Sequence, residues 1–316
     1  MILTLPMAGL IKNQFPNARI YFLGNSYTKE IVLCSEFIDE FINYDELEKL
    51  DSNEKIIALK NLNLDVFVHV FPKKEISRLA KQAKVPLRIG TTNRLYHWLY
   101  CNKLIQLSRK KSNLHESQLN IKLLKFLNIN TNISLDLIPT LYGFTKITEL
   151  KNEYKEIIDP SRINLIFHPK SKGSAREWGI NNFEHLIKLL PQKKYKIFIS
   201  GTVQDGNLMQ EFINNNSELT DLTGKLSLQQ FIAFINACDG LIAASTGPLH
   251  IAAALNKKAI GLFSPMKPID PGRWMPVGKD AHHLVINKSC SDCRKKNECA
   301  CIKSIQASQI LSILEK

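Results

Sequence analysis

Residues 240–255, GLIAASTGPLHIAAAL, predict a buried strand that turns directly into a helix. The strand, 240–244, contains only small and apolar residues, and Pro248 suits the first turn of the helix that follows. Ser245 or Thr246 can cap this helix, and Gly247 lets a ligand approach the backbone closely. Strands that turn into helices in this way are typical of α/β folds with parallel sheets.

The start of this helix has two interpretations. Its free backbone N–H groups and positive dipole end can bind an anion such as a diphosphate, with His250 near enough to reach a phosphate or sugar oxygen. An ordinary turn with a capping hydroxyl and a buried histidine explains the same residues. The residues of this turn alone leave both interpretations open.

The same alternation extends through the chain. In the second half it predicts strands at 163–169, 196–201 and 259–263, with helices near 181–190 and 227–236. The first half predicts strands at 18–24 and 65–72 and helices at 74–83 and 116–127. A polar stretch, 149–161, reads as a linker. We therefore expect two doubly wound α/β domains facing each other across a cleft, at 1–155 and 160–316.

A second loop occupies the equivalent position after strand 163–169. Residues 168–178, HPKSKGSAREW, mix small residues with cations. Ser171, Ser174 and Arg176 can neutralise a diphosphate from the side opposite the 245–250 turn. The alternative is a surface loop that Trp178 anchors to the core. Both loops follow strand carboxyl ends, where open α/β sheets bind ligands.

Composition excludes several classes of protein. The chain has 316 residues, 44% of them hydrophobic, and 42 basic against 29 acidic residues give a net charge of +13. Such a composition excludes a disordered, collagen-like or coiled-coil chain. We expect no membrane-spanning helix, because no apolar run is long enough, and no signal peptide, because residues 1–6 lack a basic region. A cytoplasmic protein follows as the expectation.

The positive charge is concentrated in residues 73–111. This segment holds eleven basic residues and one acid, Glu75, with Tyr96, Trp98 and Tyr100 interleaved. It is either a solvated face or the contact for an anionic partner: a membrane surface, a phosphorylated lipid or sugar, or nucleic acid. Since no recognised nucleic-acid motif accompanies the segment, we expect no nucleic-acid partner.

Several motifs together resemble the ADP-heptose:lipopolysaccharide heptosyltransferases, the family 9 glycosyltransferases. The resemblance is strongest in the segments 168–178, 222–231 (LTGKLSLQQF), 245–255 and 259–265 (AIGLFSP). Weaker matches are LTLPM at 3–7, FPNARIYFL at 15–23, PLRIG at 86–90 and His115-Glu116. The resemblance covers nearly the whole chain and implies a GT-B fold, with the nucleotide-sugar held mainly by the C-terminal domain.

The resemblance also assigns roles to individual residues. Ser245, Thr246, Gly247 and His250 match the segment that contacts the diphosphate and donor sugar, although many members carry an acid at the position of Ser245. Arg176 stands where the family usually has a lysine against the phosphates. Gly201 and Thr202 would lie near the nucleotide, and its adenosine end would be lined by Thr223, Gly224 and Lys225. The resemblance implies inverting transfer, and the absence of any D-x-D pair fits transfer without a metal or cofactor.

The beginning of the family pattern has no counterpart in the sequence. Members begin with a strand and a G-D turn whose aspartate is taken as the general base, whereas the match here starts at Leu3 in a predicted amphipathic helix. We therefore expect the first N-terminal strand to be missing from the sequence, and the catalytic base is unassigned. The chain is either a truncated form of a longer product or a member without its base.

The acceptor implied by the family is the phosphorylated inner core of lipopolysaccharide. Its phosphates and carboxylates would explain the basic segment, with Arg88 and Arg94 as acceptor-binding residues and peripheral contact with the inner membrane. The rival hypotheses are a GT-B transferase for another nucleotide-sugar and an inactive paralogue that acts as a binding protein. Zinc is a further hypothesis for the cysteines at 290, 293, 299 and 301, although Cys-x-Cys is tight for a zinc half-site.

Overall fold

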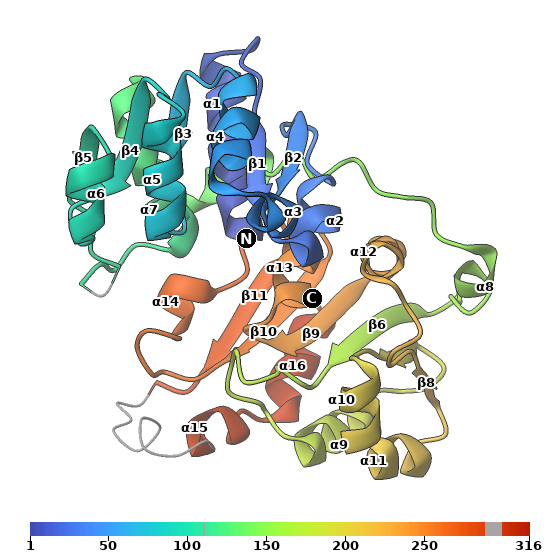
Figure 1. Ribbon diagram of the computed structural model, residues 1–316. Coiled ribbons are helices and arrows are strands. Elements are labelled where there is room, and N and C mark those ends of the chain that lie inside the picture. Colours follow the sequence, from blue (N-terminus) through green and yellow to red (C-terminus); the bar gives the residue numbers. More distant parts are fainter. Residues whose placement is uncertain (110, 288–298) are drawn as a thin grey trace. The chain divides into compact units, whose positions relative to one another are not determined.

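Strands and helices alternate through the computed structural model, which describes residues 1–109, 111–287 and 299–316 (Figure 1). The chain divides into two units, Leu3–Gly143 and Phe144–Lys316. This boundary lies before the predicted one, at 155–160, because the stretch that reads as a linker bonds to the second unit. Gln230 accepts from the Lys151 amide at 2.9 Å and donates to the Glu149 carbonyl at 3.1 Å.

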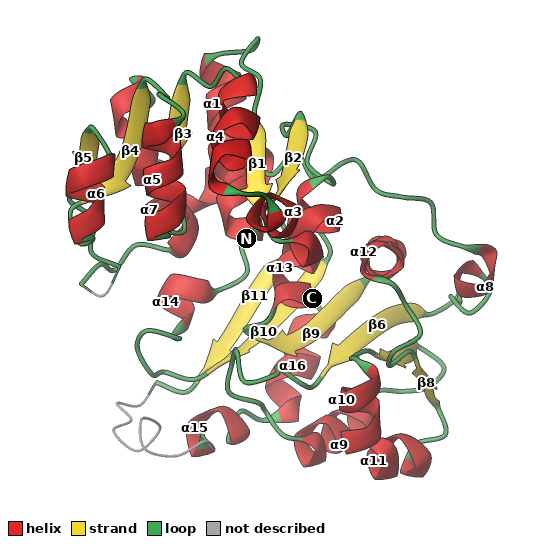
Figure 2. Cartoon of the chain, in the orientation of Figure 1, coloured by secondary structure: helices red, strands yellow, loops and turns green. Residues whose placement is uncertain are grey.

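The second unit is built on one parallel sheet of six strands in the order β11-β10-β9-β6-β7-β8 (Figure 2). The two central strands, β6 and β9, are largely buried, and their residues are apolar except for Asn164 and His168 of β6, as expected of strands covered on both faces. The strands are β6 (Ile163–His168), β7 (Tyr195–Ile199), β8 (Leu219–Asp221), β9 (Gly240–Ala244), β10 (Lys258–Phe263) and β11 (Ala281–Val285).

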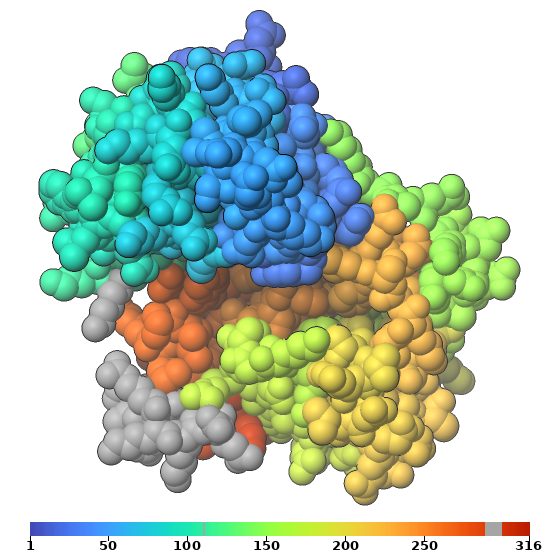
Figure 3. Space-filling model, viewed as in Figure 1, coloured from blue at the N-terminus to red at the C-terminus, as the bar shows by residue number. Residues whose placement is uncertain are grey.

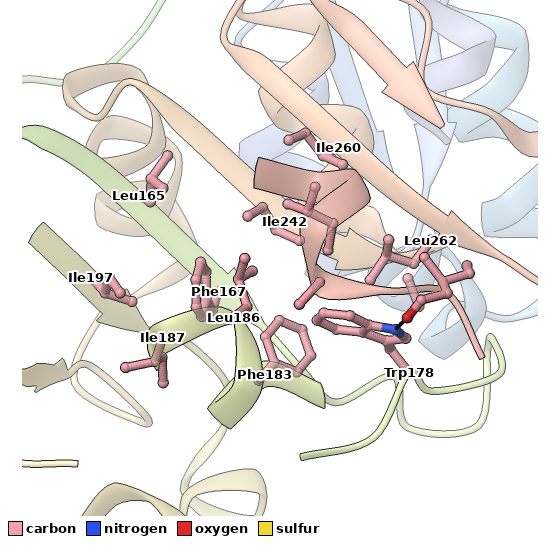
Figure 4. Packing of buried hydrophobic residues seen from close by; sticks show 14 of the residues in the cluster. Leu165, Phe167, Trp178, Phe183, Leu186, Ile187, Ile197, Ile242, Ile260 and Leu262 are labelled. Atoms are coloured by element: carbon pink, nitrogen blue, oxygen red, sulfur yellow. Dashed lines mark hydrogen bonds between the residues drawn. The ribbon is translucent and has the colours of Figure 1, made fainter. Parts of the chain in front are cut away.

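Helices cover both faces of this sheet. On one face α9 and α16 pack together against alternate strand residues that include Phe167 and Ile242 (Figure 4). On the other face, α12 places Phe234 against Phe198, and α13 packs on β9 and β10. The helices are α8 (Asn152–Lys155), α9 (Ile180–Leu189), α10 (Val203–Leu208), α11 (Gln210–Asn215), α12 (Leu228–Ala237), α13 (Gly247–Ala254), α14 (Pro271–Trp274), α15 (Ala300–Lys303) and α16 (Ala307–Leu314).

Trp178 joins the loop after β6 to the end of the chain. Its side chain is 1% exposed, its ring meets Phe183 edge to face at 4.9 Å, and its Nε1 donates to the Ile305 carbonyl at 2.9 Å (Figure 4). A buried indole with its N–H satisfied is a strong anchor, because it combines a large apolar area with a directional bond. The predicted anchoring role of Trp178 is thus what the structure shows.

The first unit holds two smaller parallel sheets, β1-β2 and β3-β4-β5, which share no strand pairing within the described residues. Helix α1 packs on the 3-10 helix η4 so closely that a Cβ on Gly9 would lie 2.5 Å from the Leu141 carbonyl oxygen. The strands are β1 (Tyr21–Gly24), β2 (Glu40–Asn43), β3 (Val66–Val68), β4 (Leu87–Thr91) and β5 (Lys103–Ile105). The helices are η1 (Ile2–Thr4), α1 (Leu5–Gln14), η2 (Ser26–Thr28), α2 (Lys29–Val32), α3 (Tyr44–Lys49), α4 (Ser52–Asn61), α5 (Lys74–Gln82), α6 (Leu95–Tyr100), α7 (Glu116–Ile121), η3 (Lys122–Leu127) and η4 (Leu135–Leu141).

The alternation read from the sequence is confirmed in the second unit and is less complete in the first. The helix predicted at 74–83 is α5, whereas the one predicted at 116–127 is α-helical only to Ile121 and continues as a 3-10 helix. The strand predicted at 65–72 is limited to 66–68. The predicted N-terminal helix is present as η1 and α1.

The last residue of β6 brings a titratable group to the edge of the sheet. Nδ1 of His168 lies 2.9 Å from the Ser200 hydroxyl, and its ring centroid lies 6.1 Å from that of Phe231. Burial lowers the pKa of His168 to about 4, against the opposing attraction of Asp205 and Glu177. The imidazole is therefore neutral at pH 7.

Removing Trp178 Nε1 should destabilise the second unit without changing its fold. Trp178→Phe leaves the buried Ile305 carbonyl without its donor, which costs about 1–3 kcal/mol, whereas Trp178→Ala adds a cavity and costs about 3–5 kcal/mol. Urea unfolding followed by circular dichroism measures both free energies. Equal stability of Trp178→Phe and the wild type would contradict the anchoring role.

His168 should make stability depend on pH. Between its ordinary pKa of about 6.5 and the folded value of about 4, the unfolded chain binds a proton that the folded chain does not. The stabilisation that comes from the neutral His168 is therefore complete above this pH window and is lost as the pH falls through it. Relative to His168→Gln, the wild type should lose about 1–3 kcal/mol of unfolding free energy between neutral and acid pH. Parallel pH curves for the two proteins would refute this.

Candidate functional site

Two neighbouring strands of the second unit open into loops at the same edge of the sheet. The chain runs from β6 outward through β7 to β8, then returns to the other side of β6 as β9 and continues outward to β11. In the register of β6 and β9, His168 lies opposite Ala243. This reversal is a topological switch point, the place where open α/β sheets bind ligands. Both loops singled out in the sequence, after β6 and after β9, begin here.

The turn after β9 presents a buried hydroxyl that does not cap its helix. Thr246 occupies the N-cap of α13 with extended backbone angles, yet its side chain makes no capping bond. Thr246 is 6% exposed, and its Oγ1 has no hydrogen-bond partner among the described residues. The expectation of a capping hydroxyl is therefore wrong for Thr246. A buried hydroxyl in this state costs free energy unless a ligand satisfies it.

The beginning of α13 leaves room for such a ligand. Gly247 is exposed, and a Cβ built on it would meet nothing within 4 Å. His250, in the first turn, is buried, and Ser245 is half-buried. Pro248 lacks an N–H group, and a helix N-terminus carries the positive end of the helix dipole.

The loop after β6 is organised by Glu177. Its Oε1 accepts from the Ser171 amide at 2.9 Å, and its Oε2 lies 3.2 Å from Lys170 Nζ. The Ser171 hydroxyl donates to the Ala175 carbonyl at 2.9 Å, and the Ser174 hydroxyl donates to the Ser171 carbonyl at 2.7 Å. Both serine hydroxyls are therefore engaged in shaping the loop. The role of Glu177 could not be predicted from the sequence, because the atoms that its carboxylate binds come close to it only in the folded loop.

Two cations of this loop differ in their surroundings. Arg176 is half-buried, whereas Lys172 is exposed, with a left-handed backbone at φ 48°.

Gly173, with φ 78°, and Gly179, with φ 100°, adopt the conformation that only glycine takes without strain. The loop thus returns sharply from β6 to α9.

The loop after β7 begins with a capping box. Thr202 accepts from the Asp205 amide at 3.3 Å, while its own amide and hydroxyl donate to Asp205 Oδ2 at 2.8 and 2.7 Å. Burial would raise the pKa of Asp205, but the bonds from Thr202 lower it below its ordinary value. Asp205 is a residue that sequence reasoning missed, although the spacing Thr202-x-x-Asp205 is a capping signal.

The loop after β8 is held in the same manner by Asp221. The carboxylate accepts from the Thr223 amide at 2.9 Å and from the Thr223 hydroxyl at 2.8 Å. Gly224, with φ 69°, donates its amide to the Gly201 carbonyl at 2.9 Å, which joins this loop to the one after β7. Lys225 Nζ folds back on the Asp221 carbonyl at 2.7 Å. The predicted nucleotide-lining residues of the two loops therefore lie together.

The two arginines predicted to bind the acceptor have different surroundings in the first unit. Arg88 is half-buried, and its guanidinium donates to the Tyr100 carbonyl at 2.8 Å and to the Val85 carbonyl. Arg94 is exposed at the N-cap of α6. Of the two, Arg94 presents its charge to solvent.

The described residues offer no metal site. No three His, Cys, Asp or Glu side chains among them gather closely enough to hold an ion. Of the cysteine cluster, 290 and 293 lie outside the described ranges, and Cys299 and Cys301 are buried. In the same ranges, no helix has the length and apolar character that crossing a bilayer requires.

Comparison with known proteins identifies the family. A sequence model described as glycosyltransferase family 9 (heptosyltransferase) matches residues 108–302. A protein named putative glycosyltransferase from Haemophilus influenzae is 23% identical over 291 residues, covering 89% of this chain and 84% of its own. Lipopolysaccharide heptosyltransferase 2 from Escherichia coli is 29% identical over 139 residues, covering 41% of this chain and 40% of its own.

Solved structures agree in fold. ADP-heptose lps heptosyltransferase II from E. coli superposes with a TM-score of 0.76 at 16% identity, covering 100% of this chain and 94% of its own. A family 9 glycosyltransferase from Veillonella parvula gives a TM-score of 0.78 at 20% identity, covering 99% of this chain and 92% of its own. The predicted fold class, GT-B with two Rossmann-like domains, is confirmed. The chain therefore belongs to glycosyltransferase family 9, the heptosyltransferase family.

Proposed function

We propose that the second unit binds ADP-heptose and that the chain transfers the heptose to the phosphorylated inner core of lipopolysaccharide. Transfer would proceed with inversion and without a metal ion. The observation that carries the proposal is the buried, unpartnered hydroxyl of Thr246 beside the open N-terminus of α13, at the β6/β9 switch point. Membership of a heptosyltransferase family supports the donor and the acceptor.

The diphosphate is proposed to lie against the turn of Thr246 and Gly247. The Thr246 hydroxyl and the N–H groups of the first turn of α13 supply donors, and the helix dipole supplies positive potential. Absence of a Cβ at Gly247 lets a phosphate approach the backbone. Ser245 and His250 would then contact the diphosphate or the donor sugar.

Cations of the loop after β6 are proposed to complete the diphosphate site. As the acceptor oxygen attacks the anomeric carbon, the bond from that carbon to the diphosphate breaks and negative charge grows on the departing ADP. Arg176 and the backbone around Ser171 and Ser174 lie at the same sheet edge as α13, from which they can stabilise that charge. The sequence contains no D-x-D pair, which fits a site that uses protein charges for this purpose.

The adenosine end is proposed to lie over the ends of β7 and β8. Gly201 and Thr202 follow β7, and Thr223, Gly224 and Lys225 follow β8. Because the Gly224 amide binds the Gly201 carbonyl, the two loops form one continuous backbone surface. Their side-chain hydroxyls are engaged with Asp205 and Asp221, so we infer that this surface contacts the nucleoside mainly through its backbone.

The first unit is proposed to bind the acceptor, with the protein in the cytoplasm at the surface of the inner membrane. Arg94, exposed at the start of α6, would contact the phosphates of the core. Arg88 would act indirectly, because its guanidinium donates to the carbonyls of Tyr100, the last residue of α6, and of Val85. This division of roles makes Arg94 the better target for a test.

Thr246→Val should separate ligand binding from stability. Valine keeps the shape of threonine and removes a buried hydroxyl without a partner, so the free energy of unfolding should stay equal or rise by about 1 kcal/mol. ADP affinity should fall about tenfold or more, because a bond to a charged oxygen is lost. Isothermal titration calorimetry with ADP and urea unfolding measure the two quantities.

Thr246→Ser, which retains the hydroxyl, serves as the matched control and should bind ADP nearly as the wild type does. Unchanged ADP affinity in Thr246→Val would remove this hydroxyl from the site. Titration with UDP and GDP tests the rival donors, and their tighter binding would contradict ADP-heptose. ADP-heptose binding without transfer to a heptose-less core would favour the inactive paralogue.

Arg94→Glu should weaken acceptor use and leave ADP binding unchanged. Reversing one charge beside a phosphorylated acceptor should raise the KM for a delipidated core oligosaccharide about tenfold at low salt. Lys60→Glu, an equal charge change on exposed α4, is the matched control and should leave this KM unaltered. An equal loss of ADP affinity and acceptor use in Arg94→Glu would contradict the assignment.

A further inference from the structure

Helix α6 turns its apolar side chains toward solvent. Leu95, Trp98 and Leu99 are 86%, 61% and 65% exposed, respectively. Their spacing, i, i+3 and i+4, places all three on one face of the helix. The opposite face carries His97, which is buried. Since a helix of a soluble domain normally buries its apolar face, this arrangement indicates a surface built to be covered.

Hydrogen bonds fix the helix in this orientation. The Thr91 amide donates to His97 Nδ1 at 2.9 Å, which ties the inner face of α6 to the end of β4. Trp98 Nε1 donates to the Thr92 carbonyl at 3.1 Å. The Lys81 ammonium donates to the Leu99 carbonyl at 2.8 Å, which joins α6 to α5. The three apolar side chains therefore cannot turn inward without breaking these contacts.

The neighbouring helix adds a row of cations. Helix α5 packs beside α6, and both lie on the outside of the first unit, in the blue-green region of Figure 3. Its exposed Lys74, Arg78 and Lys81 are spaced i, i+4 and i+7 and so share one face. From residue 73 to residue 111, Glu75 is the only acid in the sequence. An apolar face thus stands directly beside positive charge that its own segment does not neutralise.

We propose that this α5–α6 surface, formed by Leu95, Trp98, Leu99, Lys74, Arg78 and Lys81, docks the protein on a bilayer containing anionic lipids. Leucine and tryptophan side chains would enter the headgroup region, where the indole ring of Trp98 can be buried while its N–H stays bonded to the Thr92 carbonyl. The cations would stay at headgroup level, where each contributes about 1 kcal/mol near an anionic surface. Apolar insertion and charge attraction together give reversible binding.

The composition of the surface favours a bilayer over the other occupants. Lysine is depleted in the centres of protein–protein interfaces, whereas here Lys81 binds the helix that carries the apolar face. Nucleic acid would use the cations and stack bases on Trp98 but would gain nothing from exposed Leu95 and Leu99. A charged lipid surface uses both features. This inference rests on the membrane location proposed above, for which it names the surface, but it does not rest on the proposed donor or acceptor.

Vesicle binding tests the proposal. Vesicles of phosphatidylcholine with about 30% phosphatidylglycerol should bind the full chain at low salt, and purely phosphatidylcholine vesicles should bind it at least about tenfold more weakly. No lipopolysaccharide is present, so acceptor binding cannot produce the signal. Brominated lipids should quench the fluorescence of Trp98. The Trp98→Phe variant identifies the signal, because its remaining tryptophan fluorescence should no longer be quenched.

The decisive variant carries Leu95→Ser, Trp98→Ser and Leu99→Ser. It should bind anionic vesicles at least about tenfold more weakly, since most of the inserted apolar area is gone. Its melting temperature should fall only slightly, because all three side chains are exposed and the hydrogen bond that is lost, from Trp98 Nε1 to Thr92, lies at the surface. The matched control carries Ile57→Ser, Leu137→Ser and Leu208→Ser, equally apolar exposed positions elsewhere, and should bind as the wild type does.

Four results would overturn the proposal. The first is that the wild type does not bind anionic vesicles, and the second is that the decisive variant binds them as tightly as the wild type. The third is that the decisive and control variants lose the same vesicle affinity. The fourth is that the wild type binds anionic and purely phosphatidylcholine vesicles equally well. Sedimentation velocity adds a further arm. If the wild type is a dimer that does not bind vesicles, and the decisive variant is a monomer, the surface would instead bind a second copy of the chain.

Discussion

The pairing of β6 with both β7 and β9 is the constraint on which the second unit depends. Parallel strands need crossover connections, so helices must pack on both faces of the sheet and every strand must end at the same edge. The chain leaves β6 in one direction and β9 in the other, and in open α/β sheets ligands bind where the strand order reverses in this way. The position of the candidate site is thus a consequence of strand order, and Trp178 holds one of its two loops to the core.

Burial decides how much of this fold the sequence could predict. Strands β6, β9 and β10 are largely buried and mostly apolar, so their pattern is recognisable in the sequence. Strands β1, β2 and β3 have no fully buried residue and are three or four residues long, so β2, which contains Glu40, has no pattern that separates it from a loop. The boundary between the units lies earlier than the sequence indicates, because polar Lys151 and Glu149 are typical of a linker although Gln230 binds both.

The sequence predicted which loops form the candidate site better than it predicted what each side chain does. Small and hydroxyl residues after a strand identify the loops, because that composition suits any tight turn. Whether a hydroxyl is available depends on partners that fold into place: Glu177 organises the loop of Ser171, Asp205 takes the hydroxyl of Thr202, and no described residue takes that of Thr246. Local sequence cannot distinguish these three states, because each partner's position depends on the folded loop.

The basic segment likewise contains cations with unlike tasks. Arg88 bonds to the backbone carbonyls of Tyr100 and Val85, and Lys81 binds the carbonyl of Leu99, so both fasten the end of α6. Because these bonds fix the helix, its apolar face stays exposed. A helix of the same composition without these bonds would rotate and bury that face. Positive charge therefore has two physical roles in this segment: it holds the apolar side chains at the surface, and it would attract the anionic partner proposed above.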